Sequence, residues 1–203
     1  MRNTSIKMTL AFLAIASVSG AIACKKNYIH DVDPGKPGAV RALGPESQDV
    51  IAVADLMVRS IEDSKVLSDA PNPPVINMLP MSNNTRYAFN TEIFASKLKV
   101  ELNKRAKGRY VFVSRDINPE IDAEREQKRE GQLDYDPALR TKSKSGADYF
   151  LKGRADGLAA VSTKGQSDTI LYTFKLTDTE SGLDVWEDEF TTKKEGKDDV
   201  IYR

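Results

Sequence analysis

The sequence predicts one small domain of the α/β (α+β) class, with a mixed β-sheet of four to five strands flanked by helices and ending in an antiparallel hairpin. Two observations lead to this prediction. Short apolar runs alternate with segments whose apolar residues recur every three or four positions, which is the pattern of strands joined by helices. Near the C-terminus two such runs flank a turn. Strands joined by helices are expected to run parallel, so the hairpin adds an antiparallel edge.

The first helix is expected to begin near Ser47, with Glu46 or Ser47 as its cap. Its apolar residues lie three and four positions apart: Val50, Val53, Ala54, Met57, Val58 and Ile61. The pattern fades near Ser68, and the proline-rich residues 70–74 break it. Residues 75–79 then form a short buried strand, which Pro80 closes.

A polar loop at residues 82–89 separates this strand from a second helix capped by Asn90. That helix has the apolar stripe Phe94, Leu98 and Leu102 and ends at Gly108 in a left-handed cap. Residues 110–113 form the second strand. Asn118 and Pro119 open a third helix, which is expected to be solvated because residues 120–130 are mostly charged.

One or two helical turns at residues 137–145 lead to a strand at 149–151. Residues 168–177 then alternate, with Ile170, Tyr172, Phe174 and Leu176 on one face. A turn at 178–182 returns the chain as an antiparallel strand over 183–190, in which Trp186 and Phe190 share a face and are expected to pack. The polar tail, 193–203, is expected to fray.

The N-terminus has the layout of a bacterial lipoprotein signal over residues 1–23. Arg2 and Lys7 precede an apolar stretch too short to span a bilayer, and small residues lead to Cys24, the only cysteine. Acylation of Cys24 would anchor the protein in the membrane by several chains. Ala21 stands where a larger apolar residue is usual, so an ordinary secretory signal is the alternative. Because Lys25 is not the Asp that retains lipoproteins in the inner membrane, the outer membrane, facing the periplasm, is the expected location.

Residues 24–46 are interpreted as the acylated Cys and a flexible tether, because 25–46 are rich in Pro and Gly and lack a period. These 22 residues would span about 70 Å when fully extended. The globular domain is expected over 47–192. The sole histidine, His30, lies in the tether, so neither a metal site nor a catalytic role is expected for it. Without residues 1–23 the chain has 28 basic and 30 acidic residues, a balance that disfavours a nucleic-acid partner.

The folded part contains no Cys and no His, which excludes Cys-His and Ser-His nucleophilic sites and the usual zinc sites. Phosphate-binding glycine motifs are also missing. Asp134 with Asp136, or residues 187–189, offer carboxylates for a glycosidase, but solvated loop and edge-strand charge is the favoured interpretation. We therefore expect no enzyme activity, no cofactor and no metal.

Several segments together resemble the LpoB family: the strand and loop around Asn83-Asn84-Thr85, the helix leading to Gly108-Arg109-Tyr110-Val111-Phe112-Val113, then the runs 146–153 and 175–186. The last two read Gly-Ala-Asp-Tyr-Phe-Leu-Lys-Gly and Lys-Leu-Thr-Asp-Thr-Glu-Ser-Gly followed by Val-Trp. The resemblance covers about residues 50–192. It implies a compact, non-catalytic domain whose fold is like the N-terminal domain of TolB-like proteins.

The same resemblance implies an outer-membrane lipoprotein that binds and activates a class A penicillin-binding protein, a peptidoglycan synthase. The tether is much shorter than the long disordered ones of the best-known members. The alternative is an envelope scaffold or a secretion-associated lipoprotein that uses this domain as a protein-binding module; a lytic enzyme is a more distant one.

The loop after the first strand is the predicted partner-binding site, because it places adaptable polar groups beside an aromatic side chain. Its residues are Ser82, Asn83, Asn84, Thr85, Arg86 and Tyr87. The alternative is that Asn83 and Asn84 only satisfy the backbone of a turn.

Overall fold

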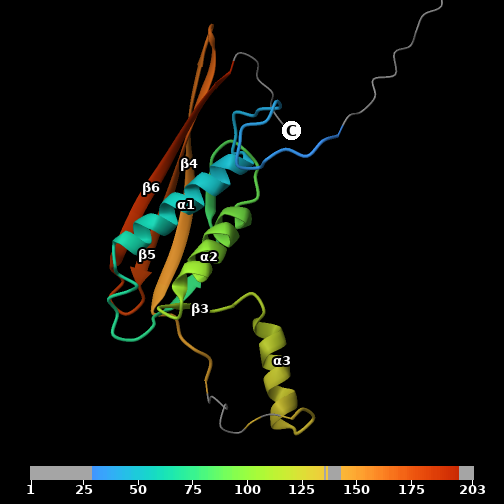
Figure 1. The fold of residues 1–203 in the computed structure, drawn as a ribbon, viewed down its shortest axis with the longest axis vertical. Helices are drawn as coiled ribbons and strands as arrows, with labels where there is room; N and C mark the ends of the chain where they lie inside the picture. The colour runs from blue at the N-terminus through green and yellow to red at the C-terminus, as the bar shows by residue number, and fades with distance from the viewer. Residues whose placement is uncertain (1–28, 135, 137–142, 197–203) are drawn as a thin grey trace, which may run out of the picture. The chain divides into compact units, whose positions relative to one another are not determined.

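The computed structural model describes residues 29–134, 136 and 143–196. From Val32 onward the chain forms one compact unit, separate from Met1–Asp31. The described helices and strands are shown in Figure 1. In chain order they are α1 (Ser47–Asp63), β1 (Val75–Met78), β2 (Ser82–Asn84), α2 (Glu92–Ala106), β3 (Val111–Phe112), α3 (Asn118–Arg129), β4 (Tyr149–Ser162), β5 (Gly165–Asp178) and β6 (Asp184–Gly196).

The sheet is mixed, as predicted, and has six strands rather than four to five. Its order is β3-β1-β4-β5-β6, and β2 also pairs with β4. β1 runs parallel to both β3 and β4, whereas β4, β5 and β6 form an antiparallel meander. The additional strand is β2, which lies inside the segment that the sequence indicated as a polar loop.

The meander is longer than the sequence predicted. β4 and β5 have 14 residues each, whereas the sequence indicated strands only at 149–151 and 168–177. After Leu151, the inward positions of β4 hold the small residues Gly153 and Ala155, which alternate with the exposed Lys152 and Arg154. This part of β4 therefore lacks the large apolar residues at alternate positions that indicate a strand. β6 continues to Gly196, so residues 193–196 of the expected tail belong to the sheet. The antiparallel β5–β6 hairpin itself is confirmed.

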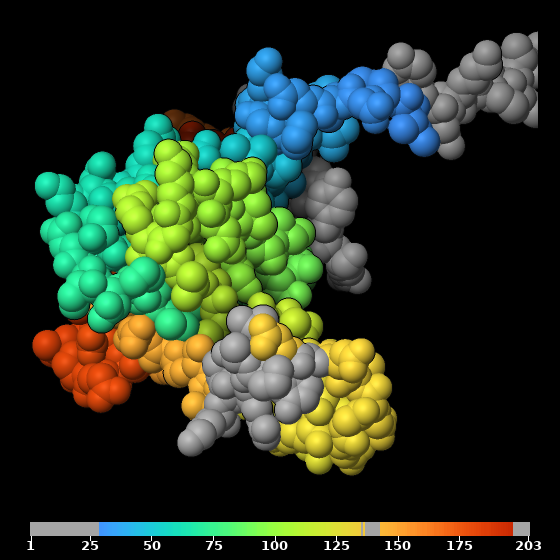
Figure 2. All heavy atoms as spheres, turned by 60° about the horizontal axis from the view of Figure 1, so that its bottom comes forward, coloured from blue at the N-terminus to red at the C-terminus, as the bar shows by residue number. Residues whose placement is uncertain are grey.

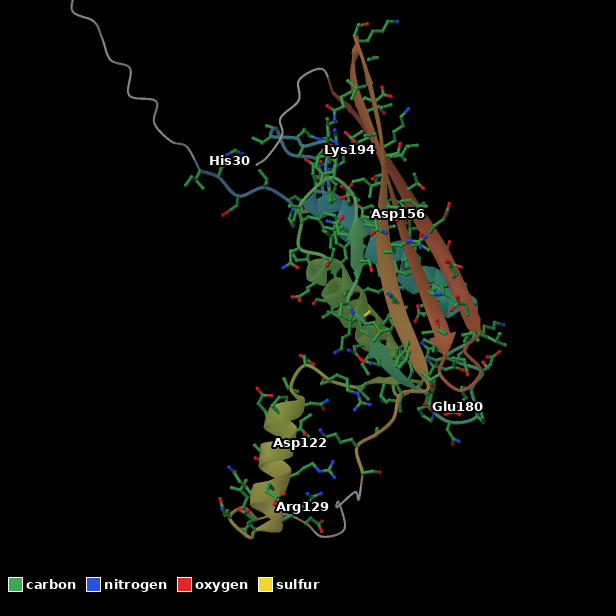
Figure 3. All side chains as sticks on the ribbon, turned by 180° about the vertical axis from the view of Figure 1, so that it is seen from behind. His30, Asp122, Arg129, Asp156, Glu180 and Lys194 are labelled. Atoms are coloured by element: carbon green, nitrogen blue, oxygen red, sulfur yellow. The ribbon has the colours of Figure 1, made fainter. Side chains whose placement is uncertain are left out.

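Helices α1 and α2 lie side by side on one face of the sheet (Figures 1 and 2). They bury the apolar stripes that the sequence predicted against β5, whose inward residues Ile170, Tyr172, Phe174 and Leu176 are all buried. A β-carbon on residue 153 would lie 2.5 Å from the Phe174 ring, so only glycine leaves room for this ring to pack over β4 at that position. The opposite sheet face has no helix over it (Figure 3).

The helix ends follow the expected chemistry with small shifts. α1 begins with a capping box between Glu46 and Asp49. The side chain of Asn90 accepts a hydrogen bond from the Glu92 N–H at the start of α2. α2 ends at Lys107, in the left-handed conformation, followed by Gly108, which also has a positive φ.

The third helix is solvated, as expected: α3 buries no residue. Of the helical turns expected at 137–145, residues 137–142 lie outside the described part, and 143–145 are not helical. Among the described residues, no helix has the length and apolar character needed to cross a membrane.

Candidate docking surface

The structure divides the six predicted loop residues into two groups with different roles. Ser82, Asn83 and Asn84 form β2 and pair in parallel with residues 154–156 of β4. The remaining three form a tight turn. Asn83 stabilises it: its Oδ1 accepts hydrogen bonds from the Thr85 N–H (2.9 Å) and Oγ1 (2.8 Å), and its Nδ2 donates to the Tyr87 carbonyl (2.8 Å). The Asn83 side chain therefore supplies hydrogen-bond partners to the backbone of a turn, as the alternative interpretation held.

Arg86 and Tyr87 bind a buried carboxylate, and of the two only Arg86 stays exposed. The Tyr87 hydroxyl donates to Asp168 Oδ2 at 2.7 Å, and the Arg86 guanidinium pairs with the same oxygen. Asp168 is only 3% exposed and also accepts a hydrogen bond from Gln166. Burial, followed by the hydrogen bond to Asp168, raises the pKa of Tyr87. These side chains thus hold the turn against the sheet.

Ser82 and Asn84 point the other way, onto the sheet face that no helix covers. In the β2–β4 register they lie beside Arg154 and Asp156, and the Asn84 amide donates to Asp156 at 2.8 Å. Ser82 also lines a cavity of about 260 Å³ on this face. We name as the open sheet face the outward side chains Ser82, Asn84, Lys152, Arg154, Asp156, Thr173, Lys175, Glu187 and Glu189.

The open sheet face has charges of both signs. The cations Lys152 and Arg154 lie on β4 with the acid Asp156, the acids Glu187 and Glu189 lie on β6, and Lys175 on β5 lies opposite both Lys152 and Glu187. Lys175 pairs with Asp184 at 2.7 Å, and Arg154 pairs with Asp156. Among the described residues, Lys152, Glu187 and Glu189 make no ion pair, so these three charges are available to a partner of complementary charge.

A second polar cluster, which the sequence did not indicate, fixes the segment before α1. Lys194 on β6 donates to the Gly44 carbonyl (2.8 Å), Glu46 (2.9 Å) and Asp49 (2.8 Å), and Figure 3 shows it beside that segment. Burial alone would raise the pKa of Glu46, but hydrogen bonds from the Ala42 N–H and from Lys194 outweigh it, so the pKa is lowered.

The packed part of the chain consequently begins well before residue 47. Ser47 Oγ donates to the Pro34 carbonyl at 2.8 Å, and Gly44 is buried against the Tyr87 ring. The sequence indicated a flexible tether as far as 46, because this segment has many Pro and Gly and few apolar residues. Its anchor, Lys194, lies about 150 residues away, and no local pattern links the two.

The residues considered for catalysis do not converge on a site. Glu187 and Glu189 lie on the open sheet face, and Asp134 and Asp136 border a cavity of about 570 Å³ beside α3, whose lining also includes the basic side chains Arg115, Lys128, Arg129 and Lys144. In the described ranges no group of three or more His, Cys, Asp or Glu is placed to hold a metal ion. Cys24 lies outside those ranges, and His30 is exposed.

A family model described as "Peptidoglycan-synthase activator LpoB" matches residues 49–191, which run from the first turn of α1 into β6. No curated protein matches the chain significantly.

Solved structures with a similar arrangement share little sequence. The LpoB C-terminal domain from Salmonella enterica is 17% identical, with a TM-score of 0.40 over 67% of this chain and 94% of that one. Escherichia coli LpoB is 15% identical, with a TM-score of 0.38 over 97% and 88%. Lipoprotein GNA1162 from Neisseria meningitidis is 14% identical, with a TM-score of 0.35 over 61% and 84%. These similarities are too distant to support a family assignment. The family model, in contrast, spans most of the chain and confirms the resemblance seen in the sequence. This chain belongs to the LpoB family of peptidoglycan-synthase activators.

Proposed function

We propose that this protein binds a class A penicillin-binding protein and raises its peptidoglycan synthase activity, without catalysis of its own. The observation that carries this proposal is the family match over residues 49–191. A binding protein activates an enzyme only if it binds the active conformation more tightly than the resting one. The docking surface must therefore recognise a synthase conformation.

We propose the open sheet face as that docking surface, with the predicted loop contributing through Ser82 and Asn84. No described helix covers it, it has charges of both signs, and it includes three charges without an ion pair among the described residues. Asn83, Thr85, Arg86 and Tyr87 support the surface from behind by closing the turn and binding Asp168.

We also propose that Cys24 is acylated and holds the protein at the outer membrane, facing the periplasm. The compact unit begins at Val32, so only residues 25–31 separate it from the anchor. Seven residues span at most about 25 Å, against about 70 Å for the tether expected from sequence. The synthase must therefore reach the domain close to the membrane that bears the anchor.

A synthesis assay with purified components tests the proposal. The chain from Lys25, which lacks the anchor, is added to class A synthases of the host, and glycan polymerisation and cross-linking are measured. We expect a higher rate, and we expect Lys152→Glu to weaken synthase binding about tenfold or more, because it sets like charges against each other at an interface. Lys104→Glu, on the exposed side of α2, is the matched control and should bind normally.

Each result has a distinct meaning. If the unaltered chain stimulates no class A synthase and retains other envelope components instead, the activator proposal is wrong and the scaffold alternative stands. If it stimulates a synthase and Lys152→Glu binds as well as Lys104→Glu, the function holds and the docking surface lies elsewhere.

A further inference from the structure

The described sheet has four free edge segments, and three of them are protected against pairing with another strand. β2 has only three residues. β3 has only two residues. β6 is long, but its sequence Asp-Val-Trp-Glu-Asp-Glu-Phe-Thr-Thr-Lys-Lys-Glu-Gly places charges along most of its length. Short edge strands and charged edge residues are the usual devices that prevent edge-to-edge association.

The outer half of β4 has no such protection. On the side away from β5, β1 pairs with residues 149–151 and β2 with 154–156, so no described strand pairs with 157–162. All six of these residues are exposed, including Leu158 at 73% and Val161 at 76%. Their sequence, Gly-Leu-Ala-Ala-Val-Ser, contains no charge and no proline. Backbone N–H and C=O groups along this side are therefore open to another strand.

We propose that residues 157–162 pair with the same residues of a second copy of this protein, antiparallel and across a two-fold axis perpendicular to the sheet. About this axis, either Ala159 or Ala160 lies opposite the same residue of the second copy. The small alanine side chains can meet there without a clash. The segment is uncharged, so self-pairing brings no like charges together. The pairing is isologous and closed, and it joins the two sheets into one.

Other strands of a second copy fit this edge less well. Pairing with β6 would set this uncharged segment against a strand that has charges along most of its length, and it would be heterologous, leaving an unpaired edge at each end and producing open chains. β3 is too short to match six residues. The two-fold axis keeps both open sheet faces on the same side of the joined sheet, so this inference is independent of the proposed function.

Cysteine cross-linking of the full chain, solubilised from membranes in mild detergent, tests the pairing. Ala159→Cys and Ala160→Cys place a thiol at each candidate axis position, and paired β-strands bring such residues within disulfide range. After oxidation, we expect one of the two to give a species of twice the mass. Val111→Cys, 47% exposed on the β3 edge, is the matched control, and the unaltered chain gives the background from Cys24.

A second substitution separates specific pairing from chance collision. Leu158→Lys, added to the cross-linking variant, removes apolar burial in both copies and should lower the cross-linked fraction about tenfold. Leu183→Lys, at a site 65% exposed outside this edge, should leave it unchanged. The proposal is overturned if neither alanine position cross-links above background, if Val111→Cys cross-links equally, or if the product contains a different protein.

Discussion

At the scale of single residues, Asp168 determines what the predicted binding loop can do. The sequence placed it at the start of an alternating strand, and nothing local indicated that Arg86 and Tyr87, 82 and 81 residues away, would bind it. Sequence reasoning chose the loop for its polar residues and its aromatic side chain. Once folded, that aromatic ring lies against Gly44, and its hydroxyl is bonded to the sheet. Tyr87 is thus a structural residue, and the exposed members of the loop are Asn83, Asn84 and Arg86.

We expect Tyr87→Phe to lower the free energy of unfolding by about 1.5 kcal/mol, because it removes a hydrogen bond to a buried carboxylate. Tyr87→Ala should cost about 3 kcal/mol, since the ring packing is lost as well. Urea unfolding at neutral pH measures both. Tyr149→Phe is the matched control, because no hydrogen bond of its hydroxyl exists among the described residues. Equal stability of Tyr87→Phe and the unaltered chain would show that the Asp168 contact is not structural and would return Tyr87 to the docking surface.

The sequence was more reliable for apolar residues. Trp186 and Phe190 were expected to pack from one strand face, and both contact the hydrophobic core. The Trp186 indole also donates to Ser60 Oγ at 3.1 Å, which supplies its polar group with a partner. Alternation along a strand fixes which residues point inward, whereas a polar side chain's partner depends on tertiary contacts that no local pattern encodes.

At the scale of elements, prediction succeeded where the apolar pattern was strong. Four elements have a distinct apolar stripe or alternation in the sequence, and the structure places all four close to their predicted bounds: α1, β1, α2 and β5. β4 was mostly missed because its inward positions hold Gly153 and Ala155, which present little apolar surface. The glycine is required there by the Phe174 ring, so the feature that hides the strand in the sequence is the one that lets it pack. β2, three polar residues, is held by pairing with β4 rather than by any propensity of its own.

The segment before α1 is held against β6 by the hydrogen bonds of Lys194. We expect Lys194→Met to lower the free energy of unfolding by about 2 to 3 kcal/mol. Asp49 would lose its only ion pair among the described residues and Glu46 would keep only the longer one to Arg41, while both carboxylates stay largely buried. Arg41 is exposed already, but release of the segment should free the backbone around it, so trypsin should cleave there faster. Unfolding in urea and limited trypsin digestion, followed by mass spectrometry, measure the two effects.

Lys193→Met is the matched control for this experiment. Lys193 is adjacent, lies on the other sheet face and is exposed, and its only ion pair among the described residues is with Glu195. Its loss should change stability by less than about 0.5 kcal/mol. Equal trypsin cleavage at Arg41 in both variants would show that the segment is not held by Lys194 and that the flexible tether extends to residue 46 as the sequence indicated.

At the scale of the whole molecule, the family and fold class were predictable from short motifs in the right order, and the family match confirms them. The extent of the packed chain was not predictable. Its N-terminal limit depends on contacts between Gly44 and Tyr87 and between Glu46 and Lys194, and its C-terminal limit on β6 pairing with β5. All of these join segments distant in sequence, and they bring residues before α1 and after Phe190 into the packed part of the chain.

The folded protein as a whole should lose stability in alkaline solution, because three tyrosines that are wholly or partly buried have raised pKa values. Burial is the main cause for Tyr87, Tyr110 and Tyr172. Their neutral forms are favoured in the folded state, so the resulting stability is fully present below the ordinary value of 10.0 and is lost as pH rises through the raised values. We expect the free energy of unfolding to fall steeply above about pH 10 as these phenols are forced to ionise.

Tyr172→Phe isolates the largest contribution to this alkaline loss. The Tyr172 hydroxyl is buried beside Thr192 and makes no well-formed hydrogen bond among the described atoms, so its removal should leave stability at pH 7 unchanged or slightly higher. Above about pH 10 the variant should lose less stability than the unaltered chain, since one buried ionisation is gone. Urea unfolding at several pH values, with phenolate absorbance recorded in parallel, measures both. A stability curve of the unaltered chain that stays flat to about pH 12 would contradict the burial of these phenols, because linkage requires a loss wherever the unfolded chain ionises first.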